Sequence, residues 1–206
     1  MTQKPFVPTK PSFLEAGLPC ASLSAECQRD NNARQRPPQN RLHIWWARRP
    51  PTICRAAILA ALLPYDLEIE KDLVYEKTDE PSEADLEKLP KKFQDHEMFF
   101  RKLITDVEPT NLTDTHEGFL NVLGILGDPD RAFRRMVLRE TYLIGNTPIL
   151  LPMDWTYRHP PAFCVSPKGP LIEFLHDEIR RSFGLSATDP VVMLDFMAGG
   201  SVIHRK

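Results

Sequence analysis

The stretch "NRLHIWWARRPPTICRAAILAALLP", residues 40–64, joins two adjacent tryptophans and two adjacent arginines to a helical pattern. Pro50 and Pro51 suit the entry to a helix, because the first turn has no use for the N–H group that proline lacks. A mostly apolar segment then runs from Ile53 to Leu63, and Pro64 ends it. The sequence predicts a helix here that is buried on nearly all sides.

The composition is that of a folded protein. The chain has 206 residues, 42% of them hydrophobic and 26% charged, which suffices for one globular domain or slightly more. It has no apolar run near the roughly 20 residues that span a membrane, and its first residues lack the apolar core of a signal peptide. We therefore expect a cytoplasmic protein that does not bind membranes.

Charge is distributed unevenly along the chain. Residues 1–65 carry nine Lys or Arg and three acidic residues, a balance of +6, so the remainder carries −8 of the total of −2. Residues 66–97 hold twelve acidic residues and five lysines. Such a composition favours solvent-exposed helices over a core. We predict an acidic helical insertion over residues 66–110.

Further helices follow from the apolar spacing and the helix-capping residues. The patterns predict a short turn within 11–19, one or two helices over 83–107 broken at Pro90, a helix capped by Asp128, and an amphipathic helix from Leu171 to Phe183. The histidines lack metal-ligand spacing and are expected at the surface or at helix caps, and the cysteines lack CxxC pairs. No metal site is predicted, and the thiols are expected to be reduced and mostly buried.

The end of the chain changes in character. Val191 to Leu194 form a short apolar run typical of a buried parallel strand, and Asp195 and the glycine turn Gly199–Gly200 follow it. Many nucleotide-binding sites begin with a strand that leads into a glycine turn, because backbone N–H groups can then approach a ligand closely. The predicted fold class is mixed α/β and mostly helical.

Three segments resemble large bacterial and archaeal adenine-specific DNA methylases. The N-terminal domain of unknown function of that family carries an HxWWARRP motif followed by an apolar helix. Residues 119–132 are similar to its Phe-Leu-Gly-x-x-Gly-Asp-Pro segment, and residues 191–203 resemble its first S-adenosylmethionine (SAM) motif. The first motif is matched by His43, Trp45, Trp46, Ala47, Arg48, Arg49, Pro50 and Arg55.

The resemblance implies an N-terminal helical module at 1–185 and, at 186–206, the first strand and glycine loop of an incomplete, Rossmann-like methyltransferase sheet. The SAM-contacting positions would be Asp195, Phe196, Ala198, Gly199 and Gly200. Phe196, Ser201 and His204 depart from the family pattern, and the family's catalytic Asn/Ser-Pro-Pro-aromatic motif is absent. We expect a truncated relative that neither binds SAM nor methylates DNA alone.

The family also implies partners, namely double-stranded DNA, the remainder of the methylase and other subunits of a restriction or phage-defence locus. Three roles remain open for the motif at 43–55. Arg48 and Arg49 contact phosphates while Trp45 or Trp46 stacks on a base, or the motif fills a core, or it packs on the cofactor. The competing function class is a non-enzymatic DNA-binding or assembly module.

Overall fold

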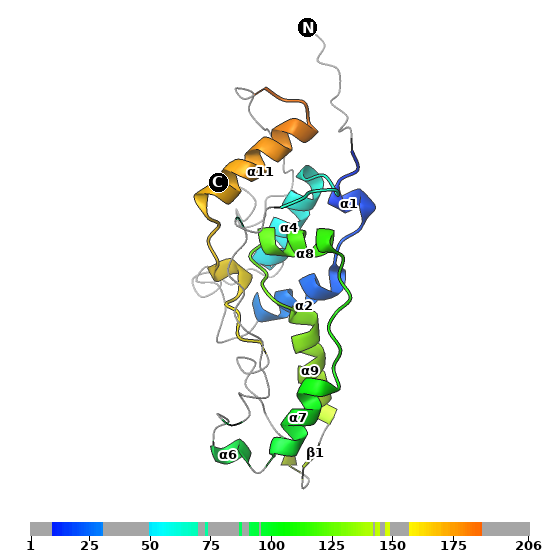
Figure 1. The fold of residues 1–206 in the computed structure, drawn as a ribbon, viewed down its shortest axis with the longest axis vertical. Helices are drawn as coiled ribbons and strands as arrows, with labels where there is room; N and C mark the ends of the chain where they lie inside the picture. Colours follow the sequence, from blue (N-terminus) through cyan, green and yellow to red (C-terminus); the bar gives the residue numbers. More distant parts are fainter. Residues whose placement is uncertain are drawn as a thin grey trace. The chain divides into compact units, whose positions relative to one another are not determined.

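The computed structural model describes residues 10–30, 50–69, 73, 87, 91–94, 96–141, 143–144, 147–148 and 157–186. Helices predominate there, which confirms the mostly helical character (Figure 1). The predicted strand and glycine loop at 191–200 lie outside the described residues. The elements are α1 (Phe13–Ala16), α2 (Cys20–Asp30), α4 (Pro51–Leu62), α6 (Lys91–Gln94), α7 (Glu97–Thr105), α8 (Asp114–Val122), α9 (Pro129–Thr141), β1 (Leu143–Ile144), β2 (Thr147–Pro148), η2 (Ala162–Cys164) and α11 (Gly169–Ser182).

The chain divides into two compact units, and it passes between them more than once. Unit 1 comprises residues 1–75, 112–125 and 161–206, and unit 2 comprises residues 76–111 and 126–160. Unit 1 therefore contains α1, α2, α4, α8, η2 and α11. Unit 2 contains α6, α7, α9 and the short antiparallel pair β1–β2.

Unit 1 has a hydrophobic core to which five helices contribute. Phe13 of α1 stacks on Phe119 of α8 with ring centroids 4.5 Å apart, and both side chains are fully buried. Leu23 of α2 and Leu171 of α11 join the same cluster. Residues far apart in the sequence thus share one core, and burying each large side chain contributes about 1.5–3 kcal/mol.

Helix α4 begins and ends where the sequence predicts, with Pro51 in its first turn. Its burial was predicted wrongly. Ala56 and Ala60 face the core with no exposed surface, whereas Arg55 lies on an exposed face of the helix. The small alanines let α4 pack closely on α1 and α2, and the helix is amphipathic.

The segment at 119–132 contains the turn that ends α8. At the end of α8, Gly124 adopts a φ of +79° and donates to the carbonyl of Asn121, while Ile125 donates to the carbonyl of Leu120. These two bonds form a Schellman motif, which glycine favours because it has no Cβ. A Cβ at Gly124 would also lie 3.0 Å from Cβ of Val165.

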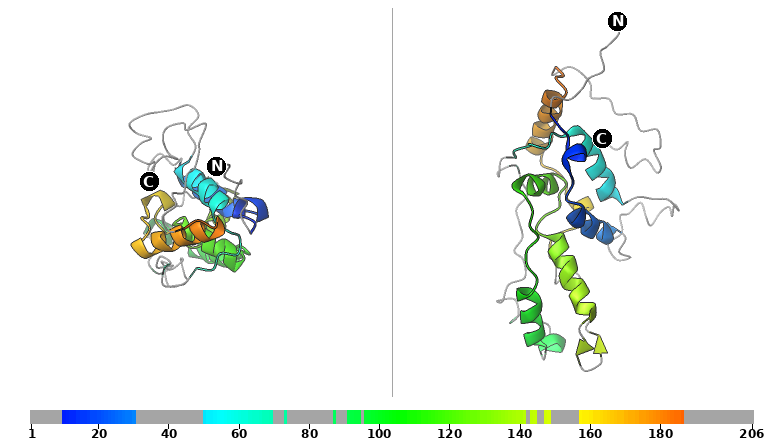
Figure 2. Two further views of the ribbon diagram at one scale, coloured as in Figure 1. Left: turned by 90° about the horizontal axis from the view of Figure 1, so that it is seen from above. Right: turned by 90° about the vertical axis from the view of Figure 1, so that its right-hand side faces the viewer.

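Unit 2 is built on α7 and α9, which lie side by side (Figures 1 and 2). Asp128 caps α9 as predicted, because its Oδ1 accepts the N–H of Arg131 at 2.9 Å. Arg131 Nε donates to the carbonyl of Val107, and Arg135 Nη2 donates to that of Ile104. The α9 arginines therefore bond one carbonyl in the last turn of α7, where the helix leaves carbonyls unpaired, and one two residues after its end.

A second contact in unit 2 surrounds Gly127. Its φ is +70°, and a Cβ at this position would overlap the imidazole ring of His159. His159 is buried, so its expected place at the surface was wrong. The ring of Tyr157 lies 5.1 Å from that of His159, and its hydroxyl donates to the carbonyl of Leu126. The segment at 157–160 is thereby fixed to the turn that precedes α9.

No helix in the part of the chain that the structure describes is long and apolar enough to cross a membrane. All four cysteines are free thiols, as expected. Cys20 and Cys164 are exposed, and Cys27 and Cys54 are half-buried, so the prediction that they are mostly buried was wrong.

Candidate functional site

Most of the predicted site residues lie outside the described residues. These are His43, Trp45, Trp46, Arg48 and Arg49 of the first motif, and Asp195, Phe196, Ala198, Gly199 and Gly200 of the SAM-like motif. Of the first motif, the structure places Pro50 and Arg55. The proposed roles of the other positions stay predictions.

Arg55 makes a contact inside unit 1. It stands on the second turn of α4, and its Nη1 donates to the carbonyl oxygen of Ala162 at 3.3 Å. Ala162 begins the short helix η2 and is fully buried. Arg55 therefore connects α4 to a residue 107 positions later in the chain.

The N–H of the same alanine is bound from α2. It donates to Oε1 of Glu26 at 2.8 Å, and Nη1 of Arg29 donates to both carboxylate oxygens of Glu26 at 3.1 and 2.9 Å. Glu26 is 0% exposed and Arg29 is 2% exposed. We name Glu26, Arg29, Arg55 and Ala162 the Ala162 clamp, since both backbone groups of Ala162 are bonded to side chains of other elements.

The ion pair in the Ala162 clamp is expensive to break. Removing one member of a buried pair leaves an uncompensated charge and typically costs about 3–5 kcal/mol. Glu26 and Arg29 were not predicted as site residues, because no helix was expected over residues 20–30. The available signal was the spacing of three between a glutamate and an arginine, which places them on neighbouring turns of a helix.

The described residues contain no group of three or more His, Cys, Asp or Glu side chains that could hold a metal ion. His159 packs against Gly127, and the ring of His116 lies 5.9 Å from that of Tyr65. These two histidines therefore have packing roles.

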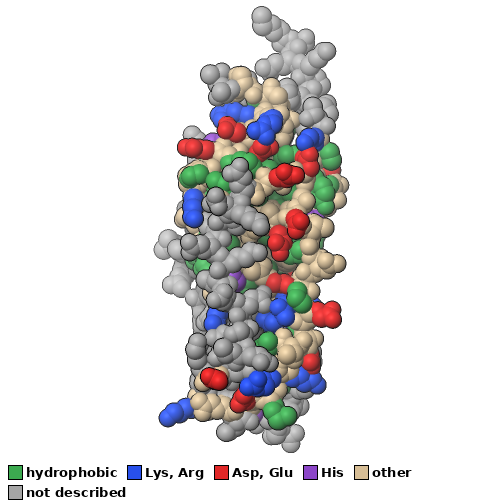
Figure 3. Space-filling view, viewed as in Figure 1, with side chains coloured by type: hydrophobic (Ala, Val, Ile, Leu, Met, Phe, Trp, Pro, Cys, Tyr) green, Lys and Arg blue, Asp and Glu red, His purple; other side chains and the backbone are tan. Residues whose placement is uncertain are grey.

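Three of the nine Lys and Arg residues in residues 1–65 lie in the described part of the chain, and each contacts a protein group. Lys10 pairs with Asp66, Arg29 with Glu26, and Arg55 with the carbonyl of Ala162. On the face in Figure 3, the Lys and Arg side chains that the structure describes are interspersed with Asp and Glu. The remaining six cations, Lys4, Arg34, Arg36, Arg41, Arg48 and Arg49, lie outside the described residues.

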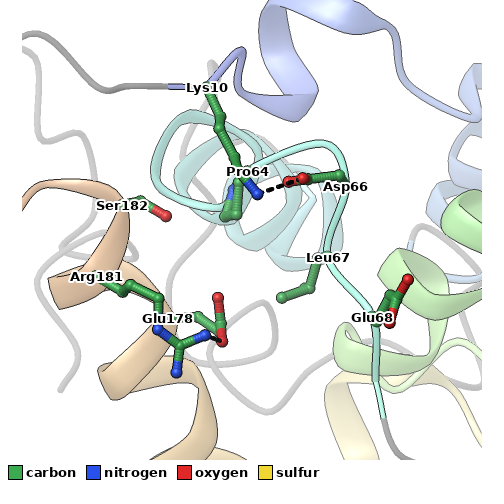
Figure 4. A pocket seen from close by; sticks show the side chains of 8 residues that line it. All are labelled: Lys10, Pro64, Asp66, Leu67, Glu68, Glu178, Arg181 and Ser182. Atoms are coloured by element: carbon green, nitrogen blue, oxygen red, sulfur yellow. Dashed lines mark hydrogen bonds and ion pairs between the residues drawn. The ribbon is translucent and has the colours of Figure 1, made fainter.

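Unit 1 also carries a surface hollow of about 420 Å³ between α11 and the segment after α4 (Figure 4). Pro64 and Leu67 contribute apolar surface to it. Its charges are largely paired, because Lys10 binds Asp66 and Arg181 binds Glu178. A further carboxylate, Glu68, leaves the lining with one excess negative charge, so the hollow does not favour phosphate. The lining consists of Lys10, Pro64, Asp66, Leu67, Glu68, Glu178, Arg181 and Ser182.

Residues 17–92 match the protein family described as "Protein of unknown function (DUF1156)". The chain carries a DUF1156 domain. The matched range includes α2, α4 and the motif at 43–50. Neither a curated protein nor a solved structure matches the chain. The core that contains α2 and α4 also includes side chains of α8 and α11, which lie beyond the matched range.

Proposed function

We propose that this chain is the N-terminal module of an adenine-specific, SAM-dependent DNA methyltransferase of a restriction or phage-defence locus. The observation that carries the proposal is the HxWWARRP motif at 43–50, which resembles the methylase family and falls inside the DUF1156 domain. The similarity of residues 191–203 to the first SAM motif supports it from the other end of the chain.

In this proposal the chain does not methylate DNA by itself. Its 206 residues contain one segment similar to a SAM motif and no Asn/Ser-Pro-Pro-aromatic motif, which in such enzymes holds the amino group of the flipped base. Asp195 and the loop at Gly199–Gly200 contribute to a SAM pocket that a further methylase segment completes. The remainder of the methylase is therefore the principal partner.

Two assays test whether the isolated chain needs the remainder of the methylase to bind SAM and to transfer a methyl group. Calorimetric titration with SAM is expected to show no binding heat, and incubation with labelled SAM and duplex DNA is expected to give no methyl transfer. A micromolar Kd for SAM would contradict the claim that the pocket needs a second segment. Methyl transfer to adenine by the chain alone would show that the reaction does not need the Asn/Ser-Pro-Pro-aromatic motif.

The second candidate function is a DNA-binding or assembly module without enzymatic activity. The observation that favours it is the balance of +6 over residues 1–65, since a basic segment is attracted to the phosphates of DNA. If Arg48 and Arg49 contact phosphates, replacing both with alanine weakens duplex binding and lowers the salt slope by about 2. If they are buried partners of acids, the same change instead lowers the melting temperature.

The matched control for this experiment is the double variant Lys91→Ala, Lys92→Ala, which removes two adjacent positive charges in α6. Fluorescence anisotropy of a labelled duplex, measured over a range of salt concentrations, gives the slope for each variant. Equal effects of the two double variants would mean that net charge alone governs binding, which would contradict a specific role of Arg48 and Arg49.

A further inference from the structure

Helix α2 carries a stripe of polar residues on its buried side. Ser22, Glu26 and Arg29 follow one another at spacings of four and three, so they lie on one face of the helix. Their exposed fractions are 0%, 0% and 2%. Burying polar groups costs free energy unless they are bonded, so such a stripe calls for an explanation beyond packing.

Two residues of this stripe, Glu26 and Arg29, are held by hydrogen bonds of defined direction. The carboxylate of Glu26 is held by Arg29 and by the N–H of Ala162, and Arg55 of α4 holds the carbonyl of the same residue. A buried ion pair adds little net stability compared with apolar side chains of the same volume. What the Ala162 clamp supplies is a fixed distance and orientation between α2, α4 and η2.

The place of the clamp in the chain suggests what this orientation serves. Arg29 is the residue before the last of α2, and Thr52, which is 1% exposed, is the second residue of α4. The connection at 31–49, whose sequence contains the HxWWARRP motif, joins the ends of these two helices. On α2 the attachment point is next to Arg29, whose partner Glu26 accepts the N–H of Ala162, and on α4 it lies one helical turn before Arg55, which donates to the carbonyl of Ala162.

We propose that Glu26 and Arg29 are positioning residues, which through the Ala162 clamp set the geometry of the two ends of the connection at 31–49. The motif is thereby attached to a rigid base made of α2, α4 and η2. The importance of this geometry for DNA or methylase contacts rests on the proposed function. The geometry itself is tested without DNA, SAM or a partner, so the two claims can fail separately.

The chain has three tryptophans, Trp45, Trp46 and Trp155, which makes fluorescence a direct measurement. In a Trp155→Phe parent, all tryptophan emission comes from the motif. Glu26→Gln keeps an oxygen for the N–H of Ala162 and removes the negative charge. We expect this variant to shift the emission maximum and to change the acrylamide quenching constant relative to the parent, at temperatures where its far-ultraviolet circular dichroism is unchanged.

A second variant is needed because Glu26→Gln leaves the buried charge of Arg29 without its carboxylate, which by itself destabilises the fold. Glu26→Gln combined with Arg29→Met keeps the acceptor and removes the cation, so no charge is left buried alone. The control is Ile179→Ala, a core substitution in α11 of the same unit, which lowers stability without touching the clamp. A positioning role requires both clamp variants to change the tryptophan signal and the control to leave it unchanged.

Three results would overturn the proposal. The first is a folded clamp variant whose emission and quenching equal those of the parent. The second is a control that moves the signal as much as the clamp variants do. The third is loss of folding in both clamp variants, since the pair would then serve stability alone.

Discussion

Unit 1 and unit 2 are each stabilised internally by a different kind of interaction. In unit 1, apolar side chains from five helices form one core, with Phe13, Phe119 and Leu120 almost completely buried. In unit 2, arginines of α9 bond backbone carbonyls near the end of α7, and a polar network connects Thr110 to Asp128 and Asp130. Unit 2 has its own buried side chains, such as Phe100 and Val107, in smaller number among the described residues.

These two kinds of interaction contribute unequally to the free energy of unfolding. Removing apolar surface from water contributes about 25 cal/mol of stability per Å². This contribution does not depend on the relative orientation of the side chains. A hydrogen bond replaces one made with water, so its net contribution is about 0.5–1.5 kcal/mol. We therefore expect unit 1 to be the more stable of the two and unit 2 to depend on a few directional contacts.

The largest effect is expected in the core of unit 1. Phe119→Ala removes a fully buried ring that stacks on Phe13, and it should lower the free energy of unfolding by about 3–5 kcal/mol. Urea denaturation followed by circular dichroism measures this change. Met98→Ala is the control, because Met98 is 86% exposed and its loss should have little effect. A cost for Phe119→Ala as small as that of the control would mean that this core does not hold unit 1 together.

A smaller effect is expected at Gly127 in unit 2. Alanine there must adopt a left-handed conformation and displace the ring of His159, at a cost of about 1–3 kcal/mol. Gly169→Ala is the matched control, since Gly169 has open space around it and no positive φ. Equal melting temperatures for the two alanine variants would contradict the described turn.

The cap of α9 should matter less. Asp128→Ala removes the acceptor for the N–H of Arg131, and the loss of this cap should lower the stability of unit 2 by about 1 kcal/mol, to which the lost bonds from the N–H and hydroxyl of Thr110 add. Asp128→Asn keeps a capping oxygen and should cost clearly less. Thermal unfolding compares the two variants, and an asparagine variant as unstable as the alanine variant would contradict the capping role, because the charge or the second acceptor oxygen, to which Thr110 donates, would then be what Asp128 supplies.

The smallest effect concerns pH. The backbone N–H and hydroxyl of Ser12 donate to the Glu15 carboxylate, which lowers the pKa of Glu15 below its ordinary value of 4.5. A carboxyl whose pKa is lowered on folding stabilises the protein above the ordinary value, and this contribution is lost as pH falls through the lowered one. Wild type should therefore lose stability relative to Glu15→Gln on acidification below about pH 4.5. Parallel stability curves for the two proteins in that range would refute it.

Local signals in the sequence were sufficient for several helices. Pro51 and Pro64 delimit α4, and Asp128 with Pro129 marks the start of α9. Gly184 follows the end of α11 with a φ of +57°, as the pattern of that helix predicts. Each of these boundaries depends on residues next to one another, which is why the sequence reveals it.

Helix α2 and the Ala162 clamp could not be found in the same way. The buried face of α2 carries Ser22, Glu26 and Arg29, so its pattern is that of a solvent-exposed segment. Its bonding partner, the N–H of Ala162, lies 136 residues away from Glu26. Burial of polar side chains by a distant segment leaves no periodic pattern.

Native-state hydrogen exchange is the most direct test of the central claim, that α2 and α4 of the DUF1156 domain share one cooperative core with residues 112–125 and 161–186. Amides of α2, α4, α8 and α11 are expected to share one high free energy of opening, and those of α7 and α9 are expected to exchange through a lower one. Amides of α11 that open far more easily than those of α4 would show that α11 is not part of that core.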